Sequence, residues 1–127
     1  MIKYVFLIAI PLLANSCTAA HNATYYNLHP LELQEAIEAC PEKYPAGVTC
    51  EQLNVSATQI NVLASELHQD PQGFGRKILE LQEHLAKLAV ELKQYPNHPE
   101  LLTSIDSKNT QLAERLAIVK WLESPRG

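Results

Sequence analysis

One stretch of the chain carries apolar residues at the spacing of a helix that packs along its whole length against another helix. Its apolar positions are separated alternately by four and three residues: Phe74, Ile78, Leu81, Leu85, Leu88 and Leu92. Because a helix completes a turn about every 3.6 residues, this spacing places all of them on one face. The stripe predicts an amphipathic helix over about residues 73–94 that needs an apolar partner.

A second stripe follows the segment Tyr95-Pro-Asn-His-Pro99, whose prolines interrupt the first. Its members are Leu102, Ile105, Asn109, Leu112, Leu116 and Val119. They predict a helix over about 98–122, capped by Asn97 or His98. Two stripes joined by a short turn predict an antiparallel helical hairpin. Asn109 has two interpretations: a buried amide that fixes register, or a wet position at the end of a local core.

Two further helices are expected before the hairpin. The pair His29-Pro30 begins a helix over about 30–40, since Pro suits the first helical position. Thr49 begins another over about 49–68, and Gln52 completes a capping-box pattern. The apolar residues of this second helix are Leu53, Ala57, Ile60, Leu63, Ala64 and Leu67. Asp70-Pro-Gln-Gly73 is typical of a turn. Strand-type alternation is missing.

The expected fold is therefore all-α, a small antiparallel bundle or hairpin of helices that occupies residues 29–123. The helix over 49–68 is expected to pack on the hairpin as a third member. The stripes also allow a homodimer through apolar surface that the fold leaves uncovered. Residues 17–28 are small and polar apart from Tyr25-Tyr26, and are expected to form a flexible tether.

The start of the chain has the pattern of a signal peptide over residues 1–16. Lys3 supplies a positive charge, and the apolar run Tyr4–Ala14 contains Pro11 and is shorter than the roughly 20 residues of a membrane-spanning helix. Ala14 and Ser16 satisfy the small-residue rule for cleavage before Cys17. A small residue before Cys also resembles a bacterial lipobox, in which Cys17 would be lipidated. Ordinary cleavage there, or after Ala19 or Ala20, is the alternative.

The charge balance argues against a nucleic-acid partner. Without Lys3, nine basic residues face fourteen acidic ones, a net charge of −5. A nucleic-acid-binding domain would present a basic face to phosphates, whereas Arg76-Lys77 is the only adjacent basic pair. Motifs of phosphate loops, nucleophile elbows and zinc proteases are missing too. Glu80 and His84 stand one turn apart, which a solvated surface pair explains. We expect no enzyme activity and no cofactor or metal.

If the chain is exported, its three cysteines can be assigned roles. With Cys17 assigned to a lipid, Cys40 and Cys50 remain as a pair for a disulfide in an oxidising compartment. The segment between them contains two prolines and a glycine and reads as a loop. A bridge would staple the end of one helix to the start of the next. Two free thiols or a metal pair are the alternatives. Tyr25, Tyr26 and Tyr44 lie near this bridge in sequence and are candidate partner contacts or ordinary packing.

Residues 17–53 resemble the EexN-type entry-exclusion lipoproteins of conjugative type IV secretion systems. The resemblance consists of Cys17, the pair Tyr25-Tyr26, the acidic segment Glu35–Cys40 and a second cysteine at Cys50. It implies a lipoprotein on the cell membrane facing the periplasm, which blocks redundant DNA uptake by contacting a channel protein, without catalysis. The alternative is a secreted helical protein that binds a host or envelope partner, if Cys17 is not lipidated.

Overall fold

The computed structural model describes residues 21–43 and 45–124. In this part of the chain five helices pack together and no strand occurs. They are α1 (Ala23–Leu28), α2 (Pro30–Glu38), α3 (Cys50–Gln69), α4 (Pro71–Gln94) and α5 (Pro99–Glu123). The all-α class predicted from the sequence is confirmed. The expected signal peptide over 1–16 lies outside the described residues.

The four expected helices are present, and each bound differs from the expectation by no more than two residues. The largest differences are at α2, which ends at Glu38, and at α4, which begins at Pro71. The expected turn at residues 70–73 is wrong, because Asp70 caps α4 through a hydrogen bond from the Gly73 amide (2.9 Å) and Pro71 occupies the first turn. A single residue, Asp70, therefore makes the corner between α3 and α4.

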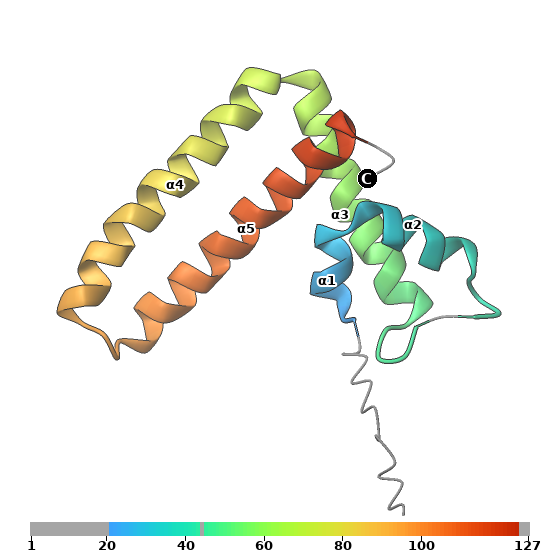
Figure 1. The fold of residues 1–127 in the computed structure, drawn as a ribbon, viewed down its shortest axis with the longest axis horizontal. Helices are drawn as coiled ribbons and strands as arrows, with labels where there is room; N and C mark the ends of the chain where they lie inside the picture. Colours follow the sequence, from blue (N-terminus) through green and yellow to red (C-terminus); the bar gives the residue numbers. More distant parts are fainter. Residues whose placement is uncertain (1–20, 44, 125–127) are drawn as a thin grey trace, which may run out of the picture.

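The expected hairpin is formed by α4 and α5. Figure 1 shows the two helices side by side, with their connecting turn at the end of the molecule away from α1, α2 and α3. Every residue of the α4 stripe is buried or half-buried, and Phe74 and Leu81 are buried most deeply. His98 caps α5, where its Nδ1 accepts a hydrogen bond from the Leu101 amide at 3.2 Å. The apolar stripe thus predicted correctly which face of α4 is buried.

The stripe of α5 is only half covered. Leu102 and Leu116 are 45% and 44% exposed, and Asn109 is exposed too. The buried residues of α5 are instead Leu101, Glu114 and Ile118. The reason is that α5 contacts α1, α2 and α3 as well as α4, so a second face is buried in addition to the one predicted. Asn109 is therefore a solvated position rather than a buried amide that fixes the register. The homodimer stays a prediction.

The first helix corrects the expectation of a flexible tether over 17–28. Residues 23–28 form α1, which is capped at its start by the Asn22 side chain accepting from the Tyr25 amide (3.0 Å). His29 alone separates α1 from α2. Tyr26 anchors α1, because it is only 4% exposed and belongs to the main apolar cluster. The cluster consists of Tyr26, Leu33, Val48, Leu53, Ile60, Phe74 and Ile118.

A buried carboxylate links three helices. Glu114 on α5 is 8% exposed and accepts hydrogen bonds from Asn27 of α1 (3.2 Å) and Gln59 of α3 (2.8 Å). A buried charge is costly unless hydrogen bonds replace its lost water, and two amide donors do so here. The Glu114 carboxylate therefore fixes how α1 and α3 sit on the C-terminal half of α5.

A second polar link joins α3, α4 and α5 near the Asp70 corner. Glu66 pairs with Lys77 at 2.7 Å and with the guanidinium of Arg115 at 3.2 Å. These two cations hold the pKa of the Glu66 carboxyl below its usual value, with the Lys77 hydrogen bond the largest cause and partial burial opposing it. The same guanidinium lies 4.7 Å from the centre of the Phe74 ring.

We expect Glu66→Gln to lower the free energy of unfolding at neutral pH by roughly 1 kcal/mol, a value discounted because the pairs are partly exposed. Since the folded pKa is lowered, the Glu66 contribution is present above the ordinary carboxyl pKa and is lost as pH falls below it. Urea unfolding at pH 7 and at about pH 3 measures this. Glu80→Gln, an exposed residue of α4, is the control. An equal effect of both variants would contradict the assignment.

Candidate functional site

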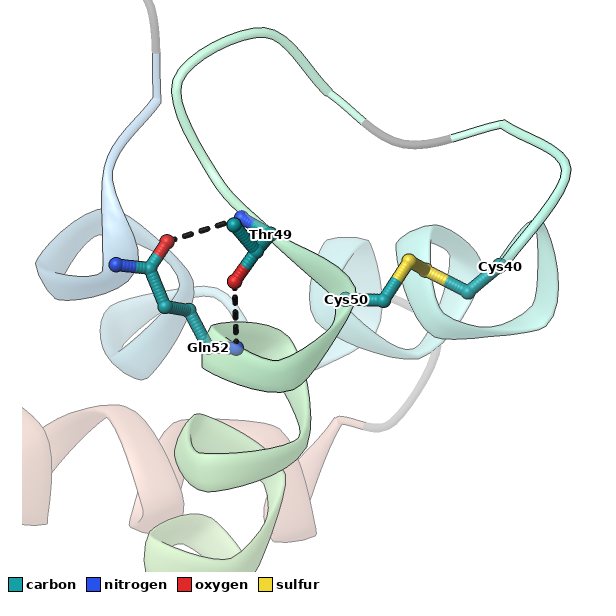
Figure 2. The surroundings of a disulfide bond; sticks show 4 residues. All are labelled: Cys40, Thr49, Cys50 and Gln52. Atoms are coloured by element: carbon teal, nitrogen blue, oxygen red, sulfur yellow. Dashed lines mark hydrogen bonds between the residues drawn. A yellow bond between two sulfur atoms is a disulfide. The ribbon is translucent and has the colours of Figure 1, made fainter.

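The Cys40–Cys50 disulfide predicted from the sequence is present, and the two Cα atoms lie 6.1 Å apart. Figure 2 shows the bond beside the start of α3, where Thr49 and Gln52 form the expected capping box with hydrogen bonds of 2.9 and 3.1 Å. Val48, which is 3% exposed, packs into the core next to it. Gly47 precedes Val48 with φ 84°, a backbone conformation that favours glycine. The connection between α2 and α3 is thus held at both ends.

Tyr25 of α1 lies at the centre of an aromatic stack with two residues just outside this helix, His21 and His29. Its ring is parallel to His21, with centroids 3.7 Å apart, and to His29, at 3.9 Å. Two rings stacked this closely must occupy opposite faces of the tyrosine. The Nδ1 of His29 also donates to the backbone carbonyl oxygen of Tyr25 at 2.7 Å. His21 and His29 each stand four residues from Tyr25, on either side of the short helix α1, so all three rings come from one local segment.

The Tyr25 hydroxyl reaches from α1 to α2. It donates a 2.6 Å hydrogen bond to the Glu32 carboxylate. This bond is the main reason that the pKa of Tyr25 is raised to about 12, and desolvation adds to it. The hydroxyl therefore remains a proton donor throughout the physiological pH range. Tyr25 is half-buried, which leaves part of the stack at the surface.

The predicted site residues divide into three groups. Tyr25 is accessible, whereas Tyr26 is a core residue, so Tyr26 is removed from the candidate contact surface. Burial of its ring raises the pKa of the Tyr26 hydroxyl. Cys40 and Cys50 are bonded to each other, as expected. Cys17 and Tyr44 lie outside the described residues, so their roles stay predictions.

Sequence reasoning missed a cavity of about 220 Å³ beside the aromatic stack. It lies between the α1–α2 junction and the last turns of α5. Its apolar walls are Leu28, Pro30, Leu31, Ala117 and Trp121. The single tryptophan of the chain was the available signal, since Trp is favoured at binding surfaces. Its neighbours come from a segment about ninety residues away, which no local pattern reveals.

None of the helices within residues 21–43 and 45–124 combines the length and the apolar character of a membrane-spanning segment. The same residues contain no group of three or more His, Cys, Asp or Glu side chains arranged to hold a metal ion. Glu80 and His84, one turn apart on α4, are both exposed. Comparisons with protein-family models, curated proteins and solved structures gave no match.

Proposed function

We propose that this protein is an exported, non-catalytic lipoprotein that blocks redundant DNA uptake by binding a component of a conjugation channel. The observation that carries the proposal is the arrangement of the N-terminal helices. A disulfide joins the end of α2 to α3, and α1 presents Tyr25 at the surface beside this stapled pair. The residues that form this arrangement are those that resemble the entry-exclusion lipoproteins.

The position of Cys17 adds a physical argument. At most about 14 Å of extended chain separates its Cα from that of His21, where the described structure begins. A lipid on Cys17 would hold α1 and Tyr25 close to a periplasm-facing membrane surface. Such anchoring raises the effective concentration near a membrane-embedded channel protein, so a weak contact can suffice.

The proposal is tested in recipient cells that express the protein and are mated with donors carrying the cognate transfer system. Expression is expected to reduce plasmid uptake. Tyr25→Ala should weaken partner binding about tenfold, the effect of losing about 1.4 kcal/mol, and so restore uptake. Cys17→Ala should restore uptake by releasing the protein from the membrane, and intact-mass analysis of the wild type should show an acylated Cys17.

Tyr95→Ala is the matched control, because Tyr95 is also an accessible tyrosine (57% exposed) but lies at the turn between α4 and α5. It is expected to leave exclusion unchanged. Circular dichroism must show equal helix content in all variants. Equal uptake with and without the wild-type protein would refute the exclusion function.

The second candidate function is a secreted helical protein that binds a host or envelope partner. It is favoured by the accessible apolar side chains of the α4–α5 hairpin, where Leu79 and Val90 are 59% and 60% exposed. Both side chains lie on α4, and a partner that covered them would remove their apolar surface from water. An unmodified N-terminus at Cys17 or His21, with the protein recovered outside the cell, would favour this candidate.

A further inference from the structure

The cavity lined by Trp121 lies between the α1–α2 junction and the last turns of α5. A smaller cavity of about 170 Å³ shares Pro30 and Trp121 with it, so the indole stands between two hollows. Leu31, on the wall of the larger one, is 40% exposed. Three elements meet here, whereas the larger hollow of about 510 Å³ runs along one polar face of α3 alone. The Trp121 cavity is therefore the better-formed apolar site.

The two charged side chains at the rim of the cavity, Glu32 and Lys120, differ in their hydrogen-bond and ion-pair partners. Glu32 accepts the hydrogen bond from the Tyr25 hydroxyl. Lys120 takes part in no ion pair with the described residues, whereas Lys77 and Arg115 both pair with Glu66. The Lys120 ammonium group is therefore the cation at this rim that a partner carboxylate would meet.

We propose that this cavity binds an apolar side chain of a partner polypeptide, next to a carboxylate of the same partner that pairs with Lys120. The occupant is thus an acidic segment with a Leu-sized or Phe-sized anchor. The walls would remove the anchor from water, which supplies most of the affinity, and Lys120 would select for the acidic neighbour. This inference rests on the proposed function as a protein-binding module and names the chemistry of the partner.

The probe for this site is N-acetyl-phenylalanine, which joins an aromatic side chain to a carboxylate, and its amide is the uncharged control. Trp121 is the only tryptophan and lines both hollows, so its fluorescence reports binding at either one, and a substitution of Ala117, which lines only the larger of the two, assigns the signal. The acid is expected to bind weakly and to change the Trp121 emission. Lys120→Met, which keeps the apolar stem, should weaken binding of the acid about threefold to fivefold and leave the amide unaffected.

Lys108→Met, on the same helix but away from the cavity, is the matched control and should bind the acid like the wild type. Ala117→Leu should fill the cavity and abolish the fluorescence change. Equal binding of acid and amide would overturn the acidic partner, and a response that survives Ala117→Leu would overturn the site. A Trp121 spectrum that depends on protein concentration without probe would show that a second copy fills the cavity, and would overturn the proposal too.

The titration uses no secretion system, so its outcome is independent of the mating experiment. Absence of probe binding together with normal exclusion would reject only the cavity. Probe binding together with normal uptake would reject only the exclusion function.

Discussion

Phe74→Ala is expected to lower the free energy of unfolding by about 3–5 kcal/mol, the usual cost of deleting a fully buried aromatic side chain. Phe74 is 1% exposed and lies at the start of α4, where α3, α4 and α5 meet. The variant leaves a cavity at this corner and removes the ring on which the Arg115 guanidinium lies. Because a domain of this size has about 5–15 kcal/mol of stability, the loss would be a large fraction of the total.

Urea unfolding monitored by circular dichroism measures the effect. Phe74→Leu retains much of the apolar volume and should cost clearly less. Leu79→Ala removes an apolar side chain from the same helix at a position that is 59% exposed, so it should change stability by no more than about 0.5 kcal/mol. Similar losses for Phe74→Ala and Leu79→Ala would show that Phe74 does not hold the corner.

The sequence predicts α4 better than α5 because α4 has one dominant partner along its length. Its stripe points toward α5 and is buried there. The helix α5 has several partners, and their contacts bury Glu114 and Ile118 on a face that the heptad spacing does not mark. A periodic pattern describes one buried face well, but it does not indicate how many faces a helix buries.

Glu114 illustrates a second limit. A glutamate within a helical stripe is normally read as solvent-exposed, since Glu is rarely buried without partners. Here the partners are the amides of Asn27 and Gln59, which come from α1 and α3. Neither is near Glu114 in sequence. Their meeting depends on how α1 packs, and α1 itself was expected to be part of a tether.

Local features were predicted most accurately. The capping box at Thr49, the His98 cap and the Cys40–Cys50 bond each depend on residues close in sequence. The Tyr25-Tyr26 pair lies between these cases. A pair of neighbouring aromatic residues indicates a contact surface or packing, and α1 places Tyr26 in the core while Tyr25 stays half-buried; a contact role for Tyr25 remains a prediction.

Removing the Cys40–Cys50 disulfide is expected to cost about 2–5 kcal/mol in the Cys40→Ser/Cys50→Ser variant. The bridged residues are ten apart in sequence, and the bond limits how far α2 can separate from α3 in the unfolded chain. The native contacts of Leu33 and Val48 remain, since these residues are 2% and 3% exposed, so the fold itself should persist at moderate temperature.

Removing the disulfide should also destabilise some helices more than others. Because α2 packs chiefly on α3, native-state hydrogen exchange in the variant should accelerate most in α1 and α2. The helices α4 and α5 pack mainly on each other, so their amides should keep more of their protection from hydrogen exchange. Adding reductant to the wild type should reproduce this pattern and leave the variant unchanged. Readily alkylated thiols in the unreduced, folded protein, or a uniform rise in exchange along all helices, would show that the bridge does not stabilise the N-terminal helices in this way.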